Sequence, residues 1–206
     1  MTGDEFARRF DVSRETLARL TAHCDLVLKW NRRINLIGRD SEPSIWWRHV
    51  ADSAQLWRLR PTKLRHWADL GAGAGYPGLV IAALAAEAAP EMRVTLVESD
   101  VRKAVFLGEA ARAMGLRPAI LSERIESIAP LDADVVSARA LAPLDRLLDH
   151  LEKHRRVGGV GLFPKGDTVH KEIESATQNR RVEHRIHPSI TAPGAAIVEV
   201  GAVSSV

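Results

Sequence analysis

The chain has 206 residues, of which 46% are hydrophobic and 27% are charged. This composition is ordinary for a globular protein, and a chain of this length buries roughly 70% of its unfolded surface on folding. The chain contains no apolar run of the ~18 residues that a membrane helix needs, and its N-terminus lacks the apolar core of a signal peptide. We therefore expect a cytoplasmic protein that does not associate with membranes.

Basic and aromatic residues are concentrated in the N-terminal third. Residues 1–66 contain 13 Lys and Arg and 8 Asp and Glu, a net charge of +5, whereas residues 67–206 contain 16 and 18, a net charge of −2. All five tryptophans lie within the first 67 residues. This pattern indicates an anionic partner on one face, although a helical cap with solvated arginines explains the composition equally well. The single cysteine, Cys24, excludes an internal disulfide and predicts a small buried side chain; no metal site is expected.

The N-terminal residues have helical spacing. Apolar side chains recur at three- and four-residue steps over residues 3–33, with a break at 11–15 where Ser13 is placed to cap a second helix. Residues 38–43 are typical of a loop, and residues 44–57 predict another helix. We expect residues 1–62 to form a helical extension that packs on the rest of the chain.

Strands alternate with helices after Pro61. The predicted strands cover residues 66–70, 92–98, 117–121, 133–137, 158–163 and 196–200, and the predicted helices cover 77–88, 102–114, 141–154 and 169–176. This alternation is typical of an α/β fold of the Rossmann-like type, with a mostly parallel twisted sheet and helices on both faces. Residues 63–206 are expected to form one compact unit.

The first predicted strand ends in a glycine-rich loop, Asp69-Leu-Gly-Ala-Gly-Ala-Gly-Tyr-Pro-Gly78. Two cofactor patterns overlap in it. The stretch from Gly73 to Gly78 fits the G-x-G-x-x-G pattern of dinucleotide-binding proteins, and Glu98 follows at the distance of a ribose-binding acid. The stretch from Asp69 to Gly75 fits the acid-x-G-x-G-x-G pattern of class I methyltransferases, which also place a ribose on the acid after the second strand.

Two features favour S-adenosylmethionine as the ligand of this loop. Asp69 attracts the ammonium group of a methionine, directly or through water, but repels a pyrophosphate. In addition, some 60 residues precede the loop, whereas dinucleotide folds normally begin near the start of the chain. An NAD-type Rossmann oxidoreductase remains an alternative, as does an RNA-binding module with a vestigial donor pocket.

Several stretches together resemble the RsmG (GidB) family, the small-subunit 16S rRNA methyltransferases G. The resemblance covers about residues 26 to 200 and is carried by the glycine loop, Trp30-Asn-Arg-Arg-Ile-Asn-Leu36, Arg48-His-Val-Ala-Asp-Ser53, Glu98 to Leu107, Val136-Ser-Ala-Arg139-Ala, and Lys165-Gly166. This chain departs from the family at Pro193-Gly-Ala-Ala196, where a basic residue is common, and Ala138 separates Ser137 from Arg139.

The resemblance implies S-adenosylmethionine-dependent methylation of guanine N7 in 16S rRNA, at the base conventionally numbered 527 in the 530 loop. It also implies an enzyme that acts on the rRNA or on a 30S particle, and we expect a monomer. The implied donor-binding residues are Asp69, Gly71, Gly73, Gly75, Tyr76, Glu98, Ile125, Glu126 and Arg139. Arg139 and Lys165 are the implied residues of the reaction site, Arg139 at the methionine end and Lys165 as a phosphate contact.

Guanine N7 carries a free lone pair, so its methylation needs positioning and not a general base. Arg32, Arg33 and Arg48, with Trp46 and Trp47, offer charges and stacking surfaces for RNA. Tryptophans at such spacings equally serve to anchor a helix, the role we expect for Trp30 and Trp57. For His49 and Asp52, a contact between helix and domain is favoured over a catalytic role.

Overall fold

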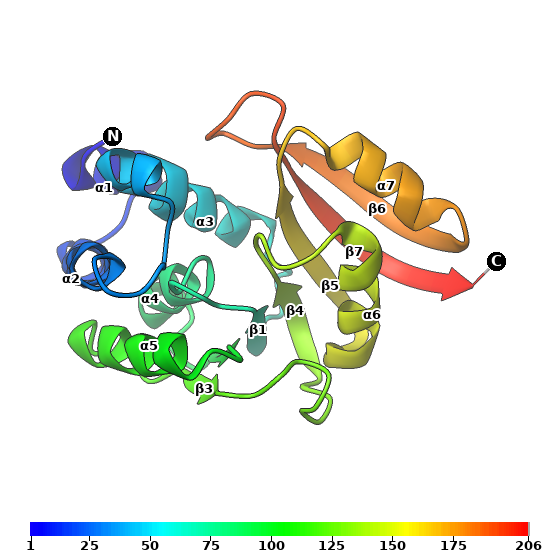
Figure 1. Ribbon diagram of the computed structural model, residues 1–206, viewed down its shortest axis with the longest axis horizontal. Coiled ribbons are helices and arrows are strands. Elements are labelled where there is room, and N and C mark those ends of the chain that lie inside the picture. Colours follow the sequence, from blue (N-terminus) through cyan, green and yellow to red (C-terminus); the bar gives the residue numbers. More distant parts are fainter. Residues whose placement is uncertain (206) are drawn as a thin grey trace.

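A seven-stranded sheet forms the centre of the computed structural model, which describes residues 1–205 (Figure 1). The strands are β1 (His66–Leu70), β2 (Arg93–Val97), β3 (Ala119–Leu121), β4 (Ala133–Ser137), β5 (Arg155–Lys165), β6 (Arg180–Pro188) and β7 (Ala196–Ser205). Their order across the sheet is β3-β2-β1-β4-β5-β7-β6. Strands β3, β2, β1, β4 and β5 run parallel, and β7 is antiparallel to both β5 and β6. The predicted α/β fold with a mostly parallel sheet is confirmed.

Strand β6 is the element that the sequence pattern missed. It lies at the edge of the sheet and pairs only with β7. Its sequence, RRVEHRIHP, has only two aliphatic side chains, Val182 and Ile186, so it lacks the apolar alternation of a buried strand. Charged side chains on an edge strand also discourage pairing with other chains.

Helices cover both faces of the sheet. They are α1 (Gly3–Phe10), α2 (Arg14–Asn31), α3 (Asp52–Ala54), α4 (Gly78–Ala88), α5 (Val101–Ala113), α6 (Leu144–His154) and α7 (Val169–Thr177). Helices α1 to α5 lie on one side of the sheet and α6 and α7 on the other (Figure 1). Successive strand residues alternate between two core clusters: Trp67, Leu96, Val135 and Leu162 belong to the first, and Ala68, Val97, Val136 and Phe163 to the second.

The N-terminal helices share the first of these clusters. Phe6 of α1 and Leu20 of α2 are fully buried in the same cluster as Trp67 of the sheet, and burial of such a side chain stabilises the fold by roughly 1.5–3 kcal/mol. As predicted, Ser13 caps α2 by accepting a hydrogen bond from the backbone N–H of Thr16. The Ser13 and Thr16 hydroxyls both donate to Glu87 of α4 at 2.7 Å, which attaches the start of α2 to the core.

The segment predicted as a helix over residues 44–57 is helical, but it is not one continuous α-helix. The segment begins with the 3₁₀ helix η1 (Arg39–Ser44), where a loop was predicted, and continues through the π-helix η2 (Trp46–Ala51), the short α3 and the 3₁₀ helix η3 (Gln55–Leu59). A π-helix is rare and is frequently found at functional sites. Hydropathy does not distinguish these helix types.

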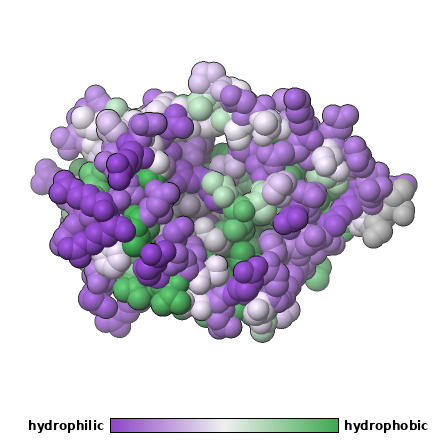
Figure 2. Space-filling view, viewed as in Figure 1, coloured by the Kyte–Doolittle hydropathy of each residue, from purple (hydrophilic) through white to green (hydrophobic). Residues whose placement is uncertain are grey.

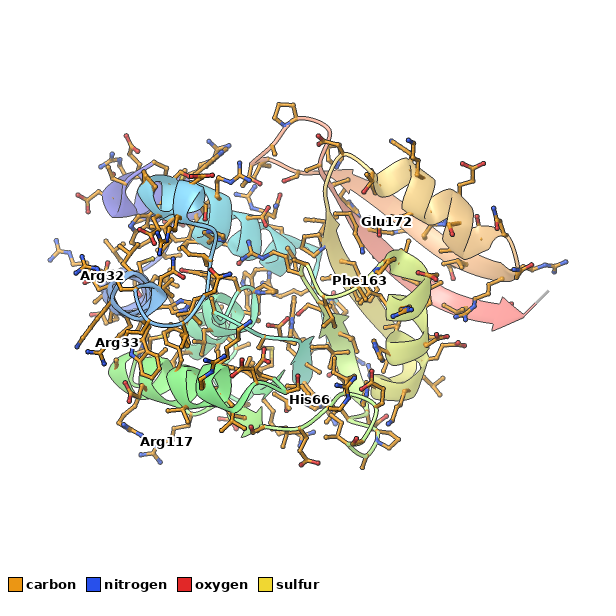
Figure 3. All side chains as sticks on the ribbon, viewed as in Figure 1. Arg32, Arg33, His66, Arg117, Phe163 and Glu172 are labelled. Carbon is orange, nitrogen blue, oxygen red and sulfur yellow. The ribbon has the colours of Figure 1, made fainter. Side chains whose placement is uncertain are left out.

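The surface seen in Figure 2 is largely hydrophilic over the N-terminal helices, with apolar side chains gathered near the middle of the face. Arg32, Arg33 and Arg117 point outward at the end of the molecule where α2 and α5 lie (Figure 3). Within residues 1–205, none of the helices combines the length and hydropathy needed to cross a bilayer.

Candidate functional site

The glycine loop follows β1 at the carboxyl edge of the sheet. Gly71, Gly73 and Gly75 have φ angles of 67°, 52° and 83°, in the left-handed region that glycine adopts without strain. A Cβ atom at Gly73 would meet only the Gly71 carbonyl oxygen, at 3.7 Å. The backbone at Gly73 is therefore open to close approach, as a ligand at this edge requires.

Asp69 lies beneath this loop and is 1% exposed. One of its carboxylate oxygens accepts a hydrogen bond from the Gly78 N–H at 2.9 Å, and the other accepts from the Ser137 Oγ at 2.7 Å. Burial raises the pKa of Asp69 to about 7, so a nearby cation would favour its ionised form. The carboxylate supports the loop in this structure, and its contact with a ligand ammonium stays a prediction.

Glu98 follows β2 and reaches the same loop. Its two carboxylate oxygens accept from the N–H groups of Gly73 and Asp100, each at 2.8 Å. The side chain thus joins the second strand to the glycine loop, and the ribose contact predicted for it is untested.

Ile125 and Glu126 come after β3 and differ in their surroundings. Ile125 is buried in the core cluster that contains Leu70 at the end of β1, and its carbonyl accepts a hydrogen bond from His154. The carboxylate of Glu126 lies near Arg124 and near His150 of α6, at 3.5 and 4.0 Å. None of these contacts tests the predicted binding of an adenine by Ile125 and Glu126, which stays a prediction.

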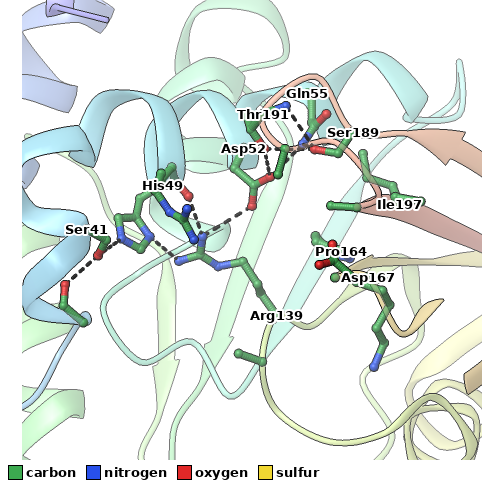
Figure 4. A pocket seen from close by; sticks show the side chains of 18 of the residues that line it. Ser41, His49, Asp52, Gln55, Arg139, Pro164, Asp167, Ser189, Thr191 and Ile197 are labelled. Carbon is green, nitrogen blue, oxygen red and sulfur yellow. Dashed lines mark hydrogen bonds and ion pairs between the residues drawn. The ribbon is translucent and has the colours of Figure 1, made fainter.

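A cavity of about 1300 Å³ opens beyond the carboxyl ends of β4 and β5 (Figure 4). Its walls come from five stretches of chain, at residues 36–41, 48–55, 139–143, 164–167 and 189–197, and from Glu172 of α7. Leu141 joins this cavity to the glycine loop, because it lines the cavity and its Cδ1 lies 2.7 Å from where a Cβ of Gly71 would be. The glycine loop and the cavity are therefore neighbours, with Leu141 between them.

Arg139 belongs to the segment after β4, and its side chain lines this cavity (Figure 4). Its Nη1 donates to the Arg48 carbonyl at 3.2 Å and to Asp52 at 3.4 Å, and its Nη2 donates to His49 Nδ1 at 2.9 Å. The guanidinium also lies over the Tyr76 ring, 5.3 Å from the ring centroid, which adds a cation–π contact. His49 and Asp52 thus make the predicted contact between helix and domain, both through Arg139 and Asp52 also through Thr191.

Lys165, at the end of β5, also lines the cavity, but its side chain is only 9% exposed. Its Nζ lies 2.8 Å from the Ala142 carbonyl and 2.8 Å from a carboxylate oxygen of Glu172 in α7. A phosphate at this lysine would have to compete with Glu172, and the predicted phosphate contact is untested.

The tryptophans contact other parts of the protein. The pairs are Trp30 with Phe106, Trp57 with Trp67, Trp46 with Phe6, and Trp47 with the Thr191 carbonyl. The anchoring role predicted for Trp30 and Trp57 is confirmed. Cys24 is 3% exposed, as predicted, and burial raises the pKa of its thiol to about 12.

The sequence did not identify three polar residues of this site. Thr191 and Gln55 both donate to one carboxylate oxygen of Asp52, at 2.7 and 2.9 Å, and Ser41 contacts His49 at 2.7 Å. Ser41 and Gln55 lie in the 3₁₀ helices η1 and η3, and Thr191 lies between β6 and β7. No motif links these three residues to Arg139 in the sequence, and only the fold brings them together. No group of three or more His, Cys, Asp and Glu side chains suited to a metal ion occurs in residues 1–205.

Comparison with known proteins gives matches over nearly the whole chain. A family model described as GidB, rRNA small subunit methyltransferase G, matches residues 16–198. The ribosomal RNA small subunit methyltransferase G of Cereibacter sphaeroides (strain ATCC 17025) is 49% identical, with all of both chains covered. The protein of the same name from Ruegeria pomeroyi is 46% identical over 97% of this chain and 98% of its own.

Solved structures with the same fold are more distant in sequence. A SAM-dependent O-methyltransferase from Thermotoga maritima has a TM-score of 0.59 and 15% identity, covering 89% of this chain and 72% of its own. A SAM-dependent methyltransferase from Aquifex aeolicus has a TM-score of 0.56 and 14% identity, and the match covers 78% of this chain and 93% of the Aquifex protein. At such identities the likeness concerns the fold alone.

Proposed function

Because the chain belongs to the GidB family of rRNA small subunit methyltransferases G, we propose that it methylates guanine N7 in 16S rRNA, using S-adenosylmethionine. The base is the one numbered 527 in the 530 loop. The observation that carries the proposal is the placing of the glycine loop beside a large cavity, with Leu141 and Arg139 at their junction.

The glycine loop suits the methionine and ribose parts of this donor. Gly73 leaves open space, Asp69 provides a buried carboxyl group whose ionised form a nearby cation would favour, and Glu98 provides a carboxylate at the loop. Binding next to Gly71 requires Leu141 to shift, because its side chain lies against that glycine. The residues proposed to hold the donor are Asp69, Gly71, Gly73, Gly75, Tyr76, Glu98, Ile125, Glu126 and Arg139.

The donor supplies an electrophilic methyl group, and guanine N7 attacks it without losing a proton. The protein therefore has to orient the base and exclude water, which lowers a barrier by as much as ~7–11 kcal/mol in well-oriented reactions. We propose that Arg139 contacts the donor carboxylate or the O6 and N7 edge of the guanine. A guanidinium is suited to both because its fork of N–H donors matches paired acceptors.

The cavity is the proposed site of the guanine. An enzyme that modifies a base extrudes it from its stack into a pocket. The walls contain Arg48, Arg139, which pairs with Asp52, and Lys165, which pairs with Glu172. Arg32 and Arg33 do not line the cavity and point outward at the end formed by α2 and α5. We propose that they contact RNA outside the extruded base.

The test is to map N7-methylguanine in 16S rRNA after incubation with the purified chain and the donor. Naked 16S rRNA and assembled 30S particles, both from cells that lack the modification, form two arms. We expect methylation at one guanine in at least one arm and its loss in Arg139→Ala, with the fold of that variant intact by circular dichroism. Absence of N7-methylguanine in both arms would contradict the proposal.

Two further measurements address the alternatives. Equilibrium dialysis with S-adenosylmethionine and with NADH distinguishes a methyltransferase from an oxidoreductase, and binding of NADH alone would favour the oxidoreductase. Donor binding without any methylated product would favour an RNA-binding module. We also propose that the protein acts in the cytoplasm as a monomer, which light scattering can check.

A further inference from the structure

The donors and acceptors in the hydrogen bonds around His49 can be assigned in only one way. An arginine side chain donates and never accepts, so the contact of 2.9 Å makes Nδ1 of His49 the acceptor. Nε2 then carries the proton and donates to Ser41 Oγ at 2.7 Å, while the Ser41 hydroxyl donates to the Gly38 carbonyl at 2.7 Å. Figure 4 shows the contacts of His49 with Ser41 and Arg139. Together these contacts require a neutral His49 in a single tautomer.

The surroundings of His49 favour that neutral form. Burial, followed by the nearby Arg139, lowers the pKa of His49 to about 3. Its ring stacks on Tyr76 with centroids 5.0 Å apart, and Tyr76 also lies under Arg139. His49 is therefore held in orientation by its ring as well as by its two nitrogens.

The π-helix η2 supplies a second hydrogen-bond acceptor for the Arg139 guanidinium. The η2 turn contains Arg48, whose carbonyl accepts from Nη1 of Arg139, and the neighbouring His49 carbonyl accepts from the Ser53 hydroxyl. The His49 carbonyl also accepts from the backbone N–H of Asp52, which follows the last residue of η2. The rare helix geometry thus coincides with the residues that contact Arg139.

Asp52 holds the guanidinium from a different direction. One of its oxygens faces Arg139, and the other accepts from Thr191 and Gln55. Thr191 belongs to the segment between β6 and β7, so Arg139 is located by the N-terminal helices and by the C-terminal hairpin together. These contacts fix a flexible side chain at the place where the glycine loop meets the cavity.

We propose that His49 is a positioning residue for Arg139, acting as a neutral hydrogen-bond acceptor that orients the guanidinium together with Asp52. The proposal rests on the function proposed above, since it concerns the orientation of Arg139 for methyl transfer. His49 is not a proton acceptor in the reaction, because its Nδ1 lone pair is engaged and N7 of guanine has no proton to lose.

The test compares two substitutions of His49. His49→Asn places an amide oxygen near the position of Nδ1 and keeps an acceptor, whereas His49→Phe keeps a ring against Tyr76 but offers no acceptor. We expect His49→Phe to lower kcat about tenfold or more, as loss of a supporting contact commonly does. His49→Asn should stay within about threefold of the wild type, a change of the size expected for one imperfect hydrogen bond.

Nitrogen-15 NMR of the Arg139 guanidinium provides a readout that is independent of turnover. Rotation of the Nη groups should be slow in the wild type and in His49→Asn, and faster in His49→Phe. If wild-type protein shows no turnover, the proposed function fails, but the NMR comparison still tests the positioning of Arg139. If His49→Phe does not fold, Ser41→Ala replaces it, with kcat lower by about threefold and faster rotation.

Thr16→Val is the matched structural control. It removes a hydrogen bond between α2 and Glu87 without touching Arg139, so it should lower the melting temperature and leave kcat and Nη rotation unchanged. The proposal is overturned if His49→Phe keeps wild-type kcat and slow rotation, or if His49→Asn is as impaired as His49→Phe. It is also overturned if Thr16→Val lowers kcat as much as His49→Phe.

Discussion

His23 of α2 should make the protein less stable in mild acid. The side chain is fully buried, and its Nε2 lies 2.7 Å from the Ala74 carbonyl oxygen of the glycine loop. Because a carbonyl only accepts, Nε2 carries the proton, and Nδ1 has no hydrogen-bond partner among the described residues. A second proton on Nδ1 would bury an unpaired positive charge, so burial lowers the pKa of His23 to about 4.

The sign and size of the effect follow from linkage. Between the folded pKa of about 4 and the unfolded value of 6.5, the unfolded chain binds a proton that the folded chain does not. The free energy of unfolding therefore decreases as the pH falls through this window. For these two pKa values, the His23 contribution between about pH 7.5 and about pH 5 amounts to about 2 kcal/mol.

Urea unfolding followed by circular dichroism at both pH values measures this effect. His49, His66 and His154 also have lowered pKa values, so the wild-type curve alone does not isolate His23. His23→Gln keeps a donor near the position of Nε2 but does not titrate. The stability difference between wild type and His23→Gln should shift by about 2 kcal/mol in favour of the variant at about pH 5.

His170→Gln, on the exposed surface of α7, is the matched control and should follow the wild type at both pH values. The explanation is refuted if the wild type and His23→Gln lose the same stability on acidification. In that case a neutral, buried His23 would not be the source of the acid sensitivity.

Two other predictions concern the glycine loop and RNA binding. Gly78→Ala would place a Cβ against Leu96 and 2.7 Å from a carboxylate oxygen of Asp69. We therefore expect the free energy of unfolding to fall by about 1–3 kcal/mol and calorimetry to show a lower melting temperature. An unchanged melting temperature would show that the loop accommodates the methyl group without strain. Arg48→Gln should reduce the slope of log Kd for rRNA against log salt by about one, measured by filter binding. An unchanged slope would mean that Arg48 neutralises no phosphate.

The local pattern of the sequence was sufficient for most regular elements. The bounds of β1 and β4 agree with the predicted strands, and Ser13 caps α2 where the break in the pattern placed it. These elements are encoded by short-range features, namely apolar runs bounded by breaking residues and a hydroxyl one residue before a helix. The same applies to the glycine loop, whose positive φ angles restrict the choice of residue at each position.

Elements with weak local signals were missed or misjudged. Strand β6 is stabilised by pairing with β7, a partner that its own composition does not reveal. The π-helix η2 has a contact with a distant donor, because its Arg48 carbonyl accepts a hydrogen bond from Arg139, 91 positions later in the chain. In both cases the stabilising contact is not local, so no window of the sequence contains it.

The α/β fold, the glycine loop and the identity of the residues around it could be predicted from the sequence, because residue type and spacing control backbone conformation locally. The contacts of those residues became known only from the three-dimensional arrangement of the chain. It placed Asp69 beneath the loop, turned Lys165 toward Glu172, and brought His49, Asp52 and Thr191 together around Arg139. Thr191 and Asp52 are 139 positions apart, and only the packing of the C-terminal hairpin against the N-terminal helices brings them within hydrogen-bonding distance.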